Sequence, residues 1–147
     1  MARVLGLDYG ERRIGLALSD PSGTVATPWR VLTVDTPALA VREIVEGLAE
    51  KGVERVVIGL PLRMDGGSGP AVDKARAFGD LLVAATRVPV TYWDERFSTV
   101  SAQQALLEGG ARRRRRKEVV DKLAAQIFLQ HYLDAQAGLP DVVDEPV

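Results

Sequence analysis

The chain has 147 residues, of which 46% are hydrophobic and 27% charged, a balance typical of one globular domain with its own core. It contains no cysteine and a single histidine, which excludes disulfide bonds, thiolate metal sites and a zinc site of the usual His/Cys kind. The first residues lack the apolar core of a signal peptide and no apolar run could cross a bilayer, so we expect a cytoplasmic protein without a membrane partner.

The N-terminal part of the sequence predicts three antiparallel strands. Runs rich in β-branched and apolar residues cover 4–9, 14–19 and 24–34, and the turns "GERR" and "DPSG" separate them. The period then changes to that of a helix, which Thr36 caps and Gly52 ends. A strand at 53–60, a helix at 70–86 and a strand at 89–94 follow. The spacing in the helix at 70–86 predicts that Val72, Ala75, Phe78, Leu81 and Leu82 face the core.

Two further helices are predicted after the last strand. One runs from Ser98 or Thr99 to Gly109–Gly110, and the other from about Lys117 to Ala137. Strands that alternate with helices pair in parallel through right-handed crossovers. The sequence therefore predicts an α/β domain over residues 1–138, with a five-stranded mixed sheet (a β-meander, then βαβαβ) flanked by helices. The acidic segment 139–147 is predicted to be a disordered tail.

A basic block stands out against an otherwise acidic chain. Its six consecutive cations are Arg112, Arg113, Arg114, Arg115, Arg116 and Lys117. The predicted elements place the block in a loop between the last two helices, where it would bind the phosphates of a nucleic acid. The alternative interpretation is a basic loop that is simply solvated.

A second notable segment is "GLPLRMDGGSGP", residues 59–70, which follows the strand at 53–60. Ligands of open α/β sheets bind at the carboxyl edge of the strands. The small residues Gly66, Gly67 and Ser68 would allow close approach of a nucleic-acid backbone and offer backbone N–H donors. The alternative is a long turn that only leads into the next helix.

Three carboxylates occupy positions where a packed fold would favour other residues. Asp8 ends the first strand, Glu95 follows the strand at 89–94, and Asp121 lies at the start of the last helix. The small pair Ala124 and Ala125 would let that helix approach the sheet closely, near the strand ends. Converging carboxylates favour hard divalent cations, so we expect Mg²⁺ or Mn²⁺, two ions, and hydrolysis of a phosphodiester.

Each of these acids also has a simpler interpretation. Asp8 could open the following turn, Glu95 could pair with Arg96, and Asp121 could stabilise the N-terminus of its helix. The topology favours the metal site, because the three acids come from different elements that the fold brings together. Asp94 is a further candidate, as a residue that would orient these acids without binding the ions itself.

Four motifs resemble a known family. "LGLDYGERRIGLALSD", "VVIGLPLRMDGGSG", "PVTYWDERFST" and "VVDKLAAQIFLQHYLD" are similar to motifs of the YqgF/RuvX family, whose members are described as pre-16S rRNA nucleases and as Holliday junction resolvases. The resemblance extends from about residue 3 to residue 135. It implies an RNase H-like fold, and it implies that Asp8, Glu95 and Asp121 match the family's metal-holding acids.

The sequence therefore predicts a metal-dependent nuclease that acts on structured RNA, at the 5′ end of pre-16S rRNA. One alternative is a Holliday junction resolvase, which would act on four-way DNA as a homodimer because it must nick two strands symmetrically. Another is an RNA-binding ribosome-assembly factor without catalysis. The first strands also resemble the phosphate loop of actin-like ATPases, but those enzymes need two such domains and this chain supplies one.

Overall fold

The structure is a computed structural model that describes residues 3–61, 69–94 and 113–138. In the last helix, side chains are described for residues 123–137. The predicted helix at 98–110 and the predicted tail at 139–147 lie outside the described residues.

A five-stranded mixed sheet forms the centre of the described fold, which confirms the predicted architecture. The strands are β1 (Arg3–Tyr9), β2 (Arg13–Ser19), β3 (Ala26–Thr33), β4 (Val53–Leu60) and β5 (Val90–Asp94). Their order is β3-β2-β1-β4-β5, with β2 antiparallel to β1 and β3, and with β1, β4 and β5 parallel. The strand bounds differ from the predicted ones by at most two residues.

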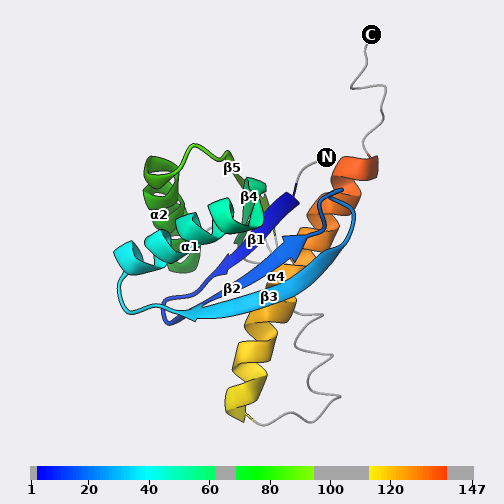
Figure 1. Ribbon diagram of the computed structural model, residues 1–147. Coiled ribbons are helices and arrows are strands. Elements are labelled where there is room, and N and C mark those ends of the chain that lie inside the picture. Colours follow the sequence, from blue (N-terminus) through cyan, green and yellow to red (C-terminus); the bar gives the residue numbers. More distant parts are fainter. Residues whose placement is uncertain (1–2, 62–68, 95–112, 139–147) are drawn as a thin grey trace.

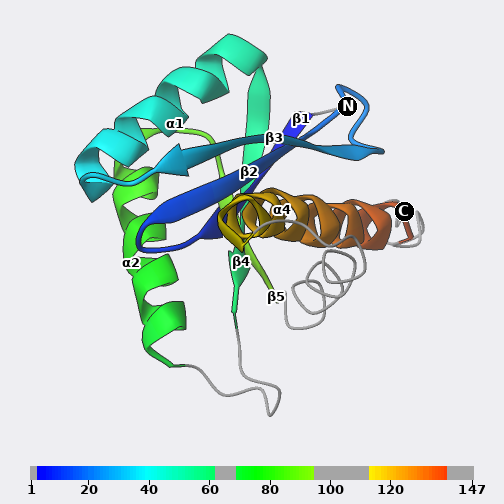
Figure 2. The same ribbon diagram turned by 90° about the horizontal axis from the view of Figure 1, so that it is seen from below.

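Helices cover both faces of this sheet. The helices α1 (Pro37–Lys51) and α2 (Pro70–Ala85) lie on one face, and the long helix α4 (Arg113–Gly138) crosses the other (Figures 1 and 2). The predicted ends of α1 are confirmed. The Thr36 hydroxyl accepts a hydrogen bond from the Leu39 N–H at 3.2 Å, and Gly52 ends the helix in the left-handed conformation at φ 65°.

The central strand β1 is buried on both faces. Leu5 and Leu7 belong to the core cluster beneath α1 and α2, whereas Val4 belongs to a second cluster with Phe128 and Leu129 of α4. Gly6 lies on the α4 side, where a Cβ atom would approach Leu129 Cβ to 2.9 Å. A glycine at this position therefore sets how closely α4 packs on the sheet.

Replacing Gly6 by Ala should destabilise the protein by about 1–3 kcal/mol, because the new methyl group overpacks the contact with α4. Urea denaturation followed by circular dichroism measures this loss. The matched control is Gly69→Ser, because a Cβ at Gly69 meets no atom of the described residues within 4 Å and serine caps helices well. Equal stability of Gly6→Ala and wild type would show that α4 is not held at this distance.

Two glutamine side chains fix α4 against the edge strand β3. The Ala26 N–H donates to Gln130 Oε1 at 2.8 Å, and Gln126 Nε2 donates to the Ala26 carbonyl at 3.2 Å. Gln130 Nε2 also donates to the Thr24 carbonyl at 2.9 Å. These contacts satisfy backbone groups where β3 begins, and they fix the position of α4 along the sheet.

The start of α4 corrects the sequence-based prediction. The helix begins at Arg113, so residues 113–117 of the basic block lie in its first turns and not in a loop. Arginine and lysine are good helix formers, and this preference outweighs the repulsion between neighbouring cations. Asp121 is then the ninth residue of α4 and lies beyond the first turn. The helix dipole favours acids only in the first turn, so it does not explain an acid at this position.

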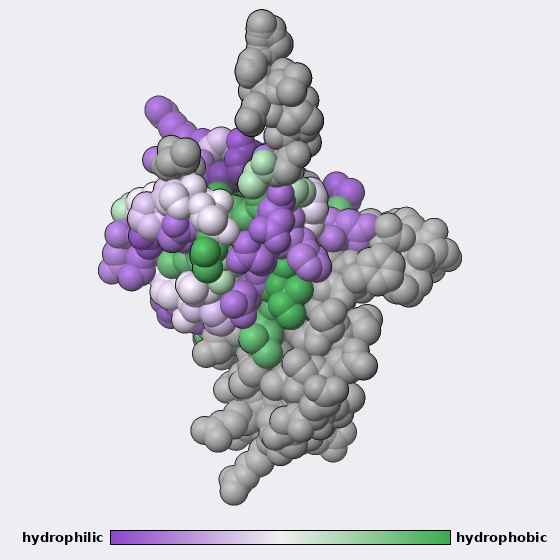
Figure 3. All heavy atoms as spheres, turned by 90° about the vertical axis from the view of Figure 1, so that its right-hand side faces the viewer, coloured by the Kyte–Doolittle hydropathy of each residue, from purple (hydrophilic) through white to green (hydrophobic). Residues whose placement is uncertain are grey.

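Exposed hydrophobic side chains are scattered over the described surface. Leu81, predicted to face the core, is 47% exposed, and Val25, Leu39 and Val83 are similarly exposed on other parts of the fold. The face in Figure 3 likewise mixes hydrophilic residues with small hydrophobic areas, as ordinary protein surfaces do. None of the helices in the described part of the chain combines the length and apolar character needed to cross a membrane.

Candidate active site

The carboxyl ends of the three parallel strands meet at one edge of the sheet. Leu7 of β1 pairs with Ile58 of β4, which pairs with Tyr92 of β5, so the three strands end at similar heights. Asp8 and Asp94 lie at this edge, and α2 begins on the same side of the molecule. This edge is where the sequence predicts the catalytic carboxylates.

Asp8 is the predicted site residue that the structure describes best. It is paired with Gly15 inside the β1–β2 ladder, and Tyr9 continues the ladder by pairing with Ile14. The turn therefore follows Asp8 and does not begin with it, contrary to the simpler interpretation. Asp8 is half-buried, and the alternation of β1 places it on the same face as Gly6, which α4 covers.

The other predicted metal ligands are described less completely. β5 ends at Asp94, directly before Glu95, which lies outside the described residues. Asp121 belongs to α4, but its side chain is outside the described part. Within the described residues no three His, Cys, Asp or Glu side chains are grouped to hold a metal ion. The three-carboxylate site therefore stays a prediction.

Of the predicted nucleic-acid contacts, Arg113–Arg116 and Lys117 lie in the first turns of α4. Arg112, Gly66, Gly67 and Ser68 lie outside the described residues. Their predicted contacts therefore stay predictions.

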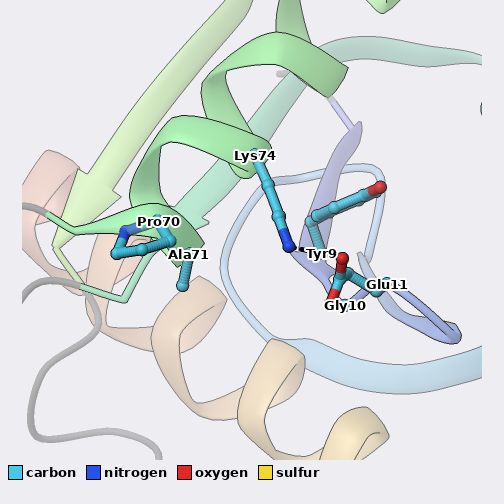
Figure 4. A pocket seen from close by; sticks show the side chains of 6 residues that line it. All are labelled: Tyr9, Gly10, Glu11, Pro70, Ala71 and Lys74. Carbon is cyan, nitrogen blue, oxygen red and sulfur yellow. Dashed lines mark hydrogen bonds and ion pairs between the residues drawn. The ribbon is translucent and has the colours of Figure 1, made fainter.

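A pocket that the sequence did not reveal lies next to Asp8. It has a volume of about 330 Å³, and its walls come from the end of β1, the β1–β2 turn and the first turns of α2. Lys74 Nζ of α2 donates to Glu11 Oε2 of the turn at 2.5 Å (Figure 4). This hydrogen bond and the charge of Lys74 lower the pKa of the Glu11 carboxyl below its usual value. The two partners are 63 residues apart, and no sequence motif links them.

Comparison with known proteins identifies the family. Residues 2–135 match the model of the family described as "RuvX: Holliday junction resolvase". The chain belongs to the RuvX family. Its relatives include proteins named "Putative pre-16S rRNA nuclease". The one from Halothermothrix orenii is 46% identical over 93% of this chain and 98% of its own length. The one from Chloroflexus aggregans is 44% identical over 90% of this chain and 94% of its own length.

Solved structures with the same fold include two resolvases. Thermus thermophilus RuvC in complex with its Holliday junction substrate superposes with a TM-score of 0.58 at 18% identity, over 94% of this chain and 97% of its own. The yeast mitochondrial Holliday junction resolvase Ydc2 superposes with a TM-score of 0.54 at 16% identity, over 92% of this chain and 79% of its own. These structures confirm the predicted RNase H-like fold, and the family model and the relatives named as nucleases confirm the predicted nuclease class of this RuvX member. Its substrate is nucleic acid, and nucleases of this fold generally use divalent metal ions.

Proposed function

We propose that this RuvX member hydrolyses phosphodiester bonds of structured RNA, at the 5′ end of pre-16S rRNA. The observation that carries the proposal is Asp8, a half-buried carboxylate inside the ladder at the carboxyl end of the central strand. The choice of RNA rests on relatives of 44–46% identity that are named for pre-16S rRNA. The resolvase structures, at 16–18% identity, support the fold alone. Such a substrate would place the protein in the cytoplasm.

We infer that Asp8, Glu95 and Asp121 hold two divalent ions, Mg²⁺ or Mn²⁺. The donor set fits these ions, because it consists of carboxylate oxygens. Two observations support the grouping: β5 ends directly before Glu95, and Asp121 precedes Ala125 by one turn of α4, at the place where α4 packs on Gly6. When bound, such ions activate water and stabilise the leaving oxygen of a phosphodiester.

The residues of the chain supply position. The neighbours of Asp8 in the strand are both paired with β2, Leu7 with Leu16 and Tyr9 with Ile14. The backbone that carries the Asp8 carboxylate is therefore rigid. A rigid ligand loses little entropy when the site assembles. The basic block and the backbone of Gly66, Gly67 and Ser68 would hold the phosphates of the substrate strand across this edge.

A direct comparison of substrates tests the proposal. A labelled RNA with the 5′ precursor extension of 16S rRNA and a four-way DNA junction are each incubated with the protein in Mg²⁺, in Mn²⁺ and in EDTA. We expect metal-dependent cleavage of the RNA and little cleavage of the junction. Paired nicks in the junction, with an intact RNA, would instead show a resolvase, which requires a two-fold homodimer. Binding of the RNA without any cleavage would show a non-catalytic assembly factor.

A further inference from the structure

The pocket beside Asp8 is built at the same sheet edge as the proposed catalytic site. Tyr9 at the end of β1 and Gly10 and Glu11 of the β1–β2 turn form one wall, and Pro70, Ala71 and Lys74 of α2 form the other (Figure 4). Its volume of about 330 Å³ is enough for a phosphate group with part of its sugar. We propose that this pocket holds a phosphodiester of the bound strand next to the one that is cut, with Lys74 as its positioning residue and Glu11 as the group that the phosphate displaces. This inference rests on the proposed nuclease function.

The ion pair between Lys74 and Glu11 in the pocket can be broken at little cost when a phosphodiester binds. The side chains of Lys74 and Glu11 are 50% and 68% exposed, so their pairing is a surface ion pair that contributes little to stability. Glu11 carries a negative charge at neutral pH as glutamates ordinarily do, and its hydrogen bond and charge interaction with Lys74 lower the pKa of its carboxyl further. A phosphodiester carries the same single negative charge and can therefore take the place of the Glu11 carboxylate on the Lys74 ammonium group.

The pocket and Asp8 share the carboxyl end of β1. Tyr9, which lines the pocket, follows Asp8 directly in this strand. Asp8 lies on the α4 side of the sheet edge and the pocket on the α2 side, so a strand laid across the ends of β1 and β4 would meet both.

The walls of the pocket are fixed by packing. The Tyr9 ring stacks on the buried ring of Phe78, with 4.7 Å between the ring centroids. A Cβ atom on Gly10 would lie 2.6 Å from the Arg13 carbonyl oxygen, so the turn can be this tight only with glycine. A rigid pocket needs no ordering when a phosphate enters, which favours binding.

Binding and its salt dependence test the role of Lys74. The variants are Lys74→Met and Glu11→Gln, with Lys51→Met as the control for loss of a lysine charge elsewhere on the surface. The probe is a fluorescein-labelled RNA duplex with a single-stranded 5′ overhang, titrated in EDTA so that no cleavage occurs. We expect Lys74→Met to weaken binding about tenfold at 50 mM salt and to lower the slope of log affinity against log salt by ~0.7–0.9. Lys51→Met should change neither quantity.

Glu11→Gln makes the test specific to the pocket. Removal of the competing carboxylate should strengthen binding, and this gain should vanish when Lys74→Met is also present. Weaker binding by Glu11→Gln, or equal losses for Lys74→Met and Lys51→Met, would overturn the proposal. A Lys74-dependent preference for a 5′-phosphate end over a 5′-hydroxyl end would overturn the assignment to an internal phosphodiester.

Cleavage kinetics separate this inference from the proposed function. If the RNA is cleaved, Lys74→Met should raise KM and leave kcat nearly unchanged, as expected for a residue that holds the substrate equally in the ground and transition states. A wild-type protein that binds but does not cleave would disprove the nuclease proposal and leave the binding test valid. An unchanged KM in Lys74→Met, with active wild type, would disprove the role of Lys74 alone.

Discussion

Replacing Asp8 by Asn should reduce cleavage on the order of a thousandfold or more, with the fold and the binding of nucleic acid largely preserved. The substitution keeps the shape of the side chain but removes the charge with which Asp8 would hold metal in the proposed site. Loss of a single preorganised donor in an active site already costs ~10²–10³ in turnover, and loss of a metal ligand should cost at least as much. Single-turnover cleavage of the labelled RNA measures the effect.

The matched control is Asp80→Asn, which removes an exposed carboxylate from α2, outside the proposed catalytic set. It should cleave the RNA at the wild-type rate. Without metal, the thermal unfolding midpoint of Asp8→Asn should equal or slightly exceed that of wild type, because the substitution removes one of three acids that would repel each other in the proposed site. Cleavage by Asp8→Asn within a few-fold of wild type would exclude Asp8 as a metal ligand.

Metal binding can be measured without cleavage. A ligand that binds only the folded state raises the free energy of unfolding by about 2.7 kcal/mol when present at a hundred times its Kd. Mn²⁺ should therefore raise the unfolding midpoint of wild type and of Asp80→Asn, and this increase should be lost in Asp8→Asn. An equal increase in all three proteins would place the ions elsewhere.

Local signals in the sequence were enough to predict most of the fold. The Thr36 cap and the left-handed Gly52 act on their immediate neighbours, so α1 could be bounded from the sequence alone. The strands β1 and β4 are buried on both faces. Their apolar runs are therefore continuous and do not alternate with polar residues, and this pattern can be read from the sequence. The position of Asp8 at a strand end followed from the same reasoning.

Features that depend on distant residues could not be predicted. Glu11 and Lys74 are 63 residues apart, and Gln130 is 104 residues from Ala26, so neither contact leaves a pattern in the sequence. The sequence places the start of α4 too late, because a run of six cations is typical of a loop. Helix propensity decided otherwise. The spacing of Leu81 predicts a core position, but the outer face of α2 is solvent-exposed there.

Converting Arg113, Arg114 and Arg115 together to Ala should weaken the binding of every nucleic acid by a similar factor. Because these residues lie in α4, consecutive positions are rotated by ~100° around the helix axis, and one strand can meet only one or two of them. Each lost phosphate contact lowers the salt slope by ~0.7–0.9, so we expect a change of about 0.7–1.8. The same relation gives an affinity loss of about ten- to a hundredfold at 50 mM salt. Fluorescence anisotropy over a salt series measures both.

Alanine is the best helix former, so the triple variant should keep its helical content by circular dichroism. The matched control changes three exposed cations of other elements, Arg42, Lys51 and Arg87, to Ala and should leave the salt slope near that of wild type. Turnover at saturating RNA should change little in the triple variant, because phosphate contacts fix the position of the strand. An unchanged affinity would show that the basic block is only a solvated part of α4. A loss of turnover at saturation with an intact salt slope would instead place an arginine in the chemical step.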